Sequence, residues 1–363
     1  MNGHDRYGRR QLFSFCAVVL LTPALRLFPS GAVRLAGRAA WLSPPAALPL
    51  LLLYFLFLCR LLSQRGEGEG LAELLARAAG ARGRTAVLLL SALWLLFYAA
   101  FLLRSGADRF ITTVYPHSSP PVFVVSMGLL GAWAALGSGR SLVRVGRLVL
   151  PLLGGILALV LFTALLGVKK ELLLPVSGRD LAPLLSGALP VLDVFAAVLV
   201  LGAFLARGVP KTPGSPRAGG RWLLGACLGL SLQAAAVLGS FGAELSAVLT
   251  RPFFYLVRNL VFFHSLERVE ALVVSFWVFP DFLMVAALLL SARRCLALVR
   301  PAAGGRAAGV LCGLGVIVCG CLLAPDAQSL SLLSERLIPA LNMSFAFLLL
   351  PGLYLSGRLR KRL

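Results

Sequence analysis

The stretch LAPLLSGALPVLDVF, residues 181–195, begins one of the long apolar segments of the chain and contains groups that a simple membrane helix avoids. It holds two prolines, a glycine and an aspartate. Proline removes a backbone hydrogen bond from a helix, and a carboxylate within a membrane is costly unless it faces a cavity or a partner. The stretch therefore predicts a membrane helix that is interrupted for a functional reason.

The composition of the whole chain is that of a membrane protein. Of its 363 residues, 59% are hydrophobic and only 13% are charged, whereas soluble proteins carry about 25% charged residues. Runs of the roughly 20 apolar residues that a helix needs to cross a bilayer recur along the chain, and no long hydrophilic stretch is left for a soluble domain. We expect an all-α polytopic membrane protein that forms a single domain over residues 1–363.

The apolar runs predict ten membrane-spanning helices, so that both termini lie on the same side. Basic loop residues gather on that side, and removing one span would scramble the pattern. Because basic loops stay in the cytoplasm, we place both termini there. The same rule accounts for the net charge of +21 without nucleic-acid binding. The expected spans are 11–33, 41–63, 85–107, 121–138, 147–168, 181–206, 222–243, 269–292, 307–324 and 337–357.

Two segments between the spans are predicted to lie along the membrane surface. Residues 66–84 are amphipathic and too polar to cross the bilayer, which is typical of an interfacial helix. Residues 251–270 are apolar but carry several charges, and we expect them to lead into the eighth span.

Span one resembles span six in containing helix-breaking residues, in LLTPALRLFPSG at 20–31. Ten spans divide into two sets of five, about 11–168 and 181–357, and these two spans come first in each set. Transporters built from inverted repeats bind substrate and ions where two such helices are interrupted. The alternative is two ordinary kinks, because glycine and proline are frequent in membrane helices. We expect a 5+5 inverted repeat with helices one and six interrupted.

Charged and polar side chains beside the two breaks form the candidate ligand site. Arg26 follows Thr22 by one turn, and Asp193 follows Pro190 by about one turn. The two charges could pair, or each could bind one charge of an amino-acid zwitterion; alternatively, Arg26 reaches out to the membrane surface. Asp193 and Asp281, in span eight, are candidates for an ion-coupling acid. The full set is Thr22, Pro23, Arg26, Ser186, Gly187, Pro190 and Asp193, with Tyr98 in the cavity wall.

The sequence lacks the signatures of soluble enzymes and of metal sites. It has no P-loop, no G-x-S-x-G motif and no H-E-x-x-H motif. Its seven cysteines and three histidines form no metal-ligand spacing. We therefore expect neither catalysis nor a metal or cofactor.

Four stretches resemble the B subunits of bacterial spore germinant receptors, the GerAB-type permeases of the amino acid–polyamine–organocation superfamily. The most specific one contains Glu267, Arg268 and Glu270, followed by Trp277. Thr22 and Pro23 stand where the family has a glycine-containing break, so the chain resembles a divergent member. The four stretches are GLAELLARAAGARGR at 70–84, LRSGADRFITTVYPHSSPPVFV at 103–124, LLLPVSGRDLAPLLSGALPVLDVF at 172–195 and RNLVFFHSLERVEALVVSFWVF at 258–279.

The resemblance implies a LeuT-like fold in the spore inner membrane and a complex with a larger membrane A subunit and a lipoprotein C subunit. It implies that the chain senses a small nutrient, mainly an amino acid, and signals to its partners to start germination. Glu267, Arg268 and Glu270 would then form a structural latch or a partner contact. Two other functions stay open: an amino-acid/cation symporter that uses Asp193 or Asp281, and a ligand-free structural or conducting partner.

Overall fold

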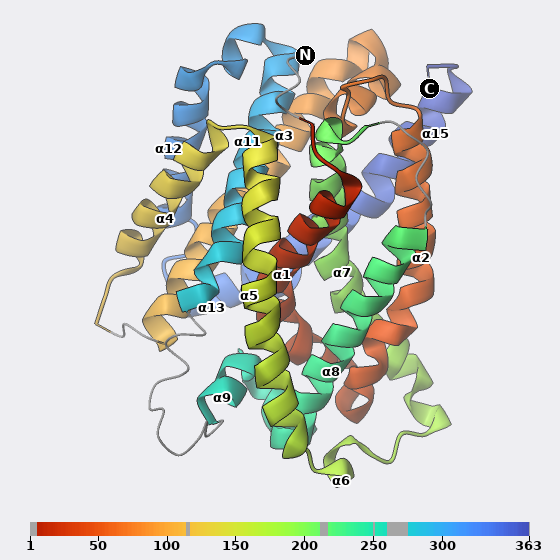
Figure 1. Cartoon of the computed structure of the whole chain (residues 1–363), viewed down its shortest axis with the longest axis vertical. Helices are drawn as coiled ribbons and strands as arrows, with labels where there is room; N and C mark the ends of the chain where they lie inside the picture. Colours follow the sequence, from red (N-terminus) through yellow and green to blue (C-terminus); the bar gives the residue numbers. More distant parts are fainter. Residues whose placement is uncertain (1–5, 114–116, 211–216, 250, 260–274, 363) are drawn as a thin grey trace.

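The computed structural model describes residues 6–113, 117–210, 217–249, 251–259 and 275–362. All regular structure within these residues is helical. The helices form a bundle, and both described chain ends lie at the same end of it, here called the termini end (Figure 1).

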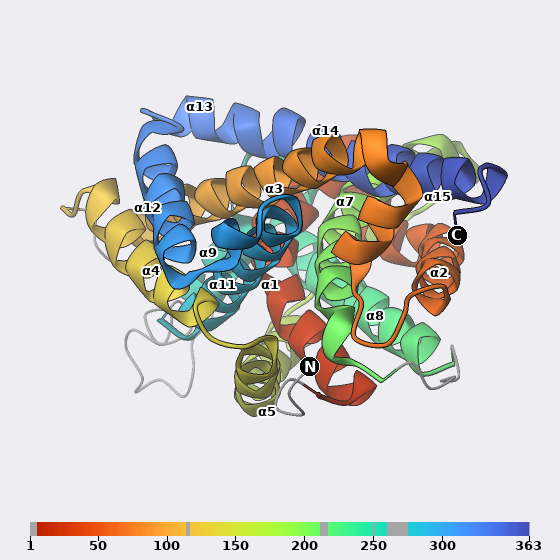
Figure 2. The same ribbon diagram turned by 90° about the horizontal axis from the view of Figure 1, so that it is seen from above.

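The helices follow the apolar runs of the sequence. The final segment is built from α13 (Ala327–Leu332), α14 (Ile338–Met343) and α15 (Leu350–Leu359), joined by π-helical turns, and it crosses the bundle obliquely (Figures 1 and 2). Two short helices are α6 (Lys170–Leu173) and α9 (Pro252–Asn259). The longer helices are α1 (Arg9–Ala36), α2 (Ser43–Ser63), α3 (Leu71–Thr113), α4 (Pro120–Ala135), α5 (Gly139–Leu166), α7 (Leu181–Leu205), α8 (Arg217–Val248), α11 (Val278–Val299) and α12 (Arg306–Leu322).

Seven helical stretches among the described residues are long and apolar enough to cross a membrane. The helices α4 and α12 are apolar but shorter. The prediction of an all-helical, multi-pass membrane protein is confirmed, whereas ten crossings and an inverted repeat stay predictions. The seven stretches are Phe28–Ser63, Leu71–Thr112, Gly139–Leu166, Gly178–Gly208, Arg217–Val248, Val278–Val299 and Ala327–Leu359.

Local chemistry sets where several helices start and bend. The Ser138 side chain accepts a hydrogen bond from the Ser141 amide at 3.2 Å and caps α5, as serine commonly does. Gly80 and Gly242 have φ of 69° and 75° and non-helical backbones inside α3 and α8, conformations that glycine tolerates best. Gly80 therefore divides α3 within the predicted surface segment 66–84, so that residues 71–79 are separated from the long part of the helix.

The pair α1–α7 occupies the middle of the bundle (Figure 2) and forms one of its most extensive helix contacts, together with α3–α11. Every residue of α7 from Val191 to Leu205 is buried. A Cβ at Gly187 would lie 2.7 Å from the Ala36 methyl, and one at Gly202 would lie 3.0 Å from Cys16 Sγ. Glycine thus permits the close approach of α7 to α1, as small residues do in membrane bundles.

The predicted interruptions of helices one and six are wrong for this structure. Both α1, with Pro23 and Pro29, and α7, with Pro190, run as single helices through their prolines. A membrane helix tolerates an internal proline because packing against neighbouring helices compensates the lost backbone hydrogen bond. The prolines therefore lie inside continuous helices that still meet at the centre of the bundle.

Candidate functional site

A cavity of about 890 Å³ lies between α1, α3, α7, α9 and the α13–α14 segment. Its mouth is formed by four side chains that are at least partly exposed, Arg34, Tyr255, Arg258 and Glu335. Because α9 lies at the end of the bundle opposite the termini (Figure 1), the cavity opens at that end. Walls formed by Leu189, Val257, Leu330 and Met343 make much of its surface apolar.

The floor of the cavity holds one buried acid and one buried base. Asp193 is 2% exposed, and its carboxylate accepts a hydrogen bond from Asn342 Nδ2 at 2.9 Å. The Arg26 guanidinium stacks on Phe101, with 4.4 Å between its carbon and the ring centroid. All three guanidinium nitrogens are buried, and none makes a hydrogen bond of ordinary geometry among the described residues, although the Tyr98 hydroxyl lies close to the group. A buried cation without well-placed acceptors is costly, so this group is suited to receive an anionic ligand.

Tyr98 lies beside these charges, behind the cavity floor. Its ring stacks with Trp94 and Phe101, at centroid distances of 6.2 and 6.4 Å. Its buried hydroxyl is near Arg26 and Asn342 but makes no hydrogen bond of ordinary geometry within the described part of the chain. Tyr98, which was predicted in the cavity wall, is not among the residues that line the cavity.

Not all predicted site residues reach the cavity. Arg26, Pro190 and Asp193 line it. Gly187 packs against α1 and Ser43, and the exposed Ser186 hydroxyl donates to the Ala182 carbonyl of its own helix at 3.3 Å. The alternative in which Arg26 reaches out to the membrane surface is not seen, since its nitrogens are buried. Arg26 and Asp193 also share no hydrogen bond, so direct pairing, one of the two arrangements left open for them, is not seen.

Thr22 and Asp281 meet outside the cavity. The Thr22 hydroxyl donates to Asp281 Oδ1 at 2.8 Å, and Asp281 Oδ2 forms a buried ion pair with Arg109. Pro23 is buried in α1 next to this contact. Glu267, Arg268 and Glu270 lie outside the described residues.

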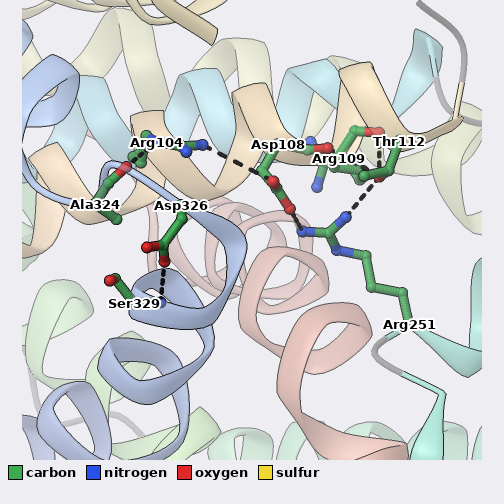
Figure 3. A network of polar contacts seen from close by, with 8 residues as sticks. All are labelled: Arg104, Asp108, Arg109, Thr112, Arg251, Ala324, Asp326 and Ser329. Atoms are coloured by element: carbon green, nitrogen blue, oxygen red, sulfur yellow. Dashed lines mark hydrogen bonds and ion pairs between the residues drawn. The ribbon is translucent and has the colours of Figure 1, made fainter. Parts of the chain in front are cut away.

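A network of charges borders the cavity near its mouth (Figure 3). Arg251, just before α9, donates to Asp108 Oδ2 at 2.5 Å and to the Thr112 hydroxyl at 2.8 Å. Arg104 lies 3.9 Å from Asp108 and donates to the Ala324 carbonyl at 3.0 Å. Across the mouth, Arg34 pairs with Glu335 at 2.6 Å.

Asp326, which is also drawn in Figure 3, caps α13 next to this network. Its Oδ1 accepts a hydrogen bond from the Ser329 amide at 2.6 Å. Hydrogen bonds from the Ser329 amide and side chain hold the pKa of Asp326 below its ordinary value, because they favour the charged carboxylate.

The termini end of the bundle is held closed by contacts to the chain after α7. The Tyr7 amide donates to the Gly208 carbonyl at 2.9 Å, and its hydroxyl donates to the Leu205 carbonyl. Arg65, which is buried, donates to the carbonyls of Ala206 and Val209, the latter at 2.7 Å. Burial, followed by repulsion from Arg9, lowers the pKa of Arg65. The cavity is thus open at one end and closed at the other.

Sequence reasoning missed several residues of this region. Asn342 and Phe101 are uncharged, so nothing distinguishes them from neighbours in an apolar helix. Arg104 and Asp108 carried a usable signal, because opposite charges four residues apart at the end of an apolar helix indicate internal pairing. The predicted span ended at residue 107, and the charges after it were therefore assigned to a loop.

This architecture is that of a multi-pass helical membrane protein. The chain is similar to the structure of Mhp1, a nucleobase-cation-symport-1 family transporter, in a closed conformation with bromovinylhydantoin bound. The identity is 16%, the TM-score is 0.62, and the match covers 93% of this chain and 78% of that one. At this identity the likeness shows the fold alone.

The family of this chain is identified from its sequence. The family model described as "Spore germination protein" matches residues 9–321, and the chain belongs to that family. No curated protein matches it. The family and the fold are those of membrane permeases and not of enzymes, in agreement with the sequence prediction.

Proposed function

We propose that this chain is the nutrient-sensing membrane subunit of a spore germinant receptor and that its ligand is an amino acid. The observation that carries the proposal is the floor of the cavity, where the Arg26 guanidinium, which makes no hydrogen bond of ordinary geometry with the described residues, and the Asp193 carboxylate lie in the wall of one space. A zwitterion supplies an anion for the first and a cation for the second. Membership in the spore germination protein family supplies the biological setting.

The cavity offers a suitable contact for the carboxylate, the ammonium group and the side chain of an amino acid. Arginine binds carboxylates through paired N–H donors, and Arg26 is held in place by its contact with Phe101. Asp193 has one donor in Asn342 and retains capacity to accept from an ammonium group. The apolar side chain of the ligand would lie against wall residues such as Leu189 and Met343.

Signalling would be a shift between two conformations of the bundle. The structure is open at the α9 end and closed at the termini end. A ligand that binds one conformation more tightly raises its population, and partner subunits would respond to that conformation. In this proposal the partners are an A-type membrane subunit and a C-type lipoprotein. The chain lies in the spore inner membrane with both termini in the cytoplasm, so that the cavity opens outward.

The test is germination of spores that carry variants of this chain. A deletion should remove the response to one or a few amino acids, measured as loss of optical density, and the wild-type gene should restore it. Asp193→Asn and Arg26→Gln should fail to restore it, because each removes one charge of the site. The matched control is Ser186→Ala, which removes an exposed hydroxyl of α7 that bonds to its own helix and does not line the cavity.

A direct binding measurement completes this test. Purified wild-type protein should be stabilised against heat by the same amino acid, and the two charge variants should not be. Normal germination by Asp193→Asn spores would contradict the proposed site. The absence of any amino-acid response, in spores and in purified protein, would favour the ligand-free partner role instead.

An amino-acid/cation symporter is the second candidate, favoured by the fold shared with a cation symporter. In that case Asp193 would be the coupling acid, since it is buried at the cavity floor. Uptake of amino acid into vesicles that collapses without a proton gradient, and that Asp193→Asn abolishes, would support it.

A further inference from the structure

A second, smaller pocket lies at the termini end of the bundle, opposite the mouth of the large cavity (Figure 1). Its volume is about 220 Å³, which is enough to admit a small polyatomic anion. The wall combines Tyr7 before α1, the start of α5, the 3₁₀ turn Ala206–Gly208 after α7 and the second half of α11. Four segments that are far apart in the sequence thus meet around one space.

Three arginines line this space, here called the arginine pocket, and none of the described residues in its wall is acidic. Arg293 and Arg294 come from α11 and are half-buried, and Arg207 comes from the turn after α7. Arg207 pairs with Glu73 at 3.1 Å, but Glu73 does not line the pocket. Because like charges around one small space repel each other, an anion in the pocket would stabilise this arrangement.

The three guanidinium groups are held by packing and leave room beside α5. Arg293 packs on α12, where a Cβ at Gly309 would lie 3.2 Å from its Cδ. Arg294 reaches the start of α5, where a Cβ at Gly139 would lie 3.3 Å from its Nη2. The absence of a side chain at Gly139 therefore keeps the space next to Arg294 open. The first turn of α5 carries no acidic residue, so the helix dipole adds partial positive charge there.

We propose that the arginine pocket binds a phosphate group, carried either by an anionic lipid headgroup or by a soluble phosphate. Arginine suits this group because its planar guanidinium forms paired hydrogen bonds with phosphate oxygens. Basic pockets between membrane helices commonly hold lipid headgroups. The stretch Gly139–Leu166, which is apolar and long enough to cross a membrane, begins at the pocket, so the pocket lies at the depth expected for headgroups.

The arginine pocket differs from the other basic residues at this end of the chain. Loop arginines gather at one end of most membrane proteins, and exposed ones such as Arg358 and Arg360 need no ligand. That rule does not account for three arginines from two distant segments around one pocket. A bound phosphate group would connect α5, α11 and the chain after α7, and it would therefore stabilise the folded protein. The proposal concerns the protein without nutrient and does not depend on the receptor function.

The experiment is thermal unfolding of the purified chain in mixed micelles, without nutrient and at constant ionic strength. One arm replaces chloride by inorganic phosphate, and the other replaces phosphatidylcholine by phosphatidylglycerol. At least one arm should give a saturable rise in the unfolding temperature of the wild type. A rise with the lipid alone identifies a headgroup as the source of the phosphate group, whereas a rise with inorganic phosphate shows that the free anion suffices.

Arg293→Gln/Arg294→Gln should lose most of this rise, because two of the three guanidinium groups are gone. The matched control is Arg358→Gln/Arg360→Gln, which removes two exposed arginines at the same end and should keep the rise. Phosphate also stabilises proteins by exclusion from their surface, and that effect would be equal in the two double variants. Equal rises in both variants, or no rise of the wild type in either arm, would overturn the proposal.

Gly139→Asp carries the test if Arg293→Gln/Arg294→Gln does not yield folded protein. It places a carboxylate beside Arg294, which should act as a built-in anion. The variant should unfold at a higher temperature than the wild type without phosphate or anionic lipid, and it should respond less to both. Gly139→Asn fills the same space without the charge and should show no such gain. A folded Gly139→Asp protein that responds as fully as the wild type would contradict the proposed site.

Discussion

Asn342 is the side chain on which the buried Asp193 carboxylate depends. It donates to Asp193 at 2.9 Å, and its own Oδ1 accepts from Trp94 Nε1 at 3.2 Å. This chain of hydrogen bonds orients the carboxylate on the cavity floor. Arg26 has no such hydrogen bond of ordinary geometry among the described residues. Its burial is therefore less compensated than that of Asp193, and it would gain more from binding a ligand of opposite charge.

Replacing Asn342 by leucine should destabilise the protein and weaken nutrient binding. The variant leaves Asp193 and the Trp94 indole without their partners, and losing a buried hydrogen bond to a charged group costs about 1.5–3 kcal/mol. Chemical unfolding of the purified variant would measure this loss. Ser356→Ala is the control, since that hydroxyl donates to the Leu353 carbonyl of its own helix and its removal should be nearly neutral.

For single residues, the sequence predicts the charged members of the site but not the neutral side chains that contact them. Arg26 and Asp193 are recognisable because a charge in an apolar run is costly unless it faces a cavity or a partner. The pairing of Asp281 with Arg109 depends on how α3 lies against α11, and no local pattern encodes that. Phe101 and Asn342 acquire their roles only through the same tertiary packing.

At the scale of helices, apolar runs identify the elements well, but prolines do not reveal interruptions. Each long apolar segment contains a helix, and within the predicted surface segment 66–84 only residues 71–79 form a distinct part of α3 before the break at Gly80. The real departures from helical backbone lie at Gly80 and Gly242. Proline in a membrane helix loses one hydrogen bond that neighbours can compensate, whereas a positive φ is a conformation that side chains resist.

Gly242→Ala tests this distinction. Gly242 has φ 75° and ψ 171°, and a Cβ there would meet only Leu172, at 3.5 Å. The substitution should therefore cost about 1–3 kcal/mol through backbone strain alone, measured as a lower unfolding temperature. Gly229→Ala in the same helix should be neutral or stabilising, because that position is helical and open. Equal effects of the two substitutions would contradict this account.

At the scale of the whole molecule, the structure is asymmetric between its two ends. The mouth of the cavity is lined by exposed charged side chains, while the termini end is closed by Tyr7 and Arg65. Sequence alone places the basic loops on one side, but it does not specify which end is open. That depends on the balance between two packings of the same helices.

Removing Arg65 should shift this balance toward opening at the termini end. Arg65→Ala deletes hydrogen bonds to backbone carbonyls after α7, and each 1.4 kcal/mol of relative stability changes the population ratio about tenfold. Cys16, a free buried thiol packed against α7, should then react faster with a maleimide applied from that end. Mass spectrometry would locate the label.

Arg306→Ala, an exposed arginine at the start of α12, is the control for this shift and should leave labelling unchanged. Unaltered Cys16 reactivity in a folded Arg65→Ala protein would show that Arg65 does not hold the termini end closed.

The separation of charged floor and apolar wall within the cavity has an evolutionary consequence. In the proposed function, Arg26 and Asp193 would bind the groups that all amino acids share, whereas Leu189, Leu330 and Met343 would contact the side chains that differ among them. A duplicated gene could therefore acquire a new nutrient preference by drift at a few wall positions. Neither the charges that anchor the ligand nor the helices that carry them would have to change.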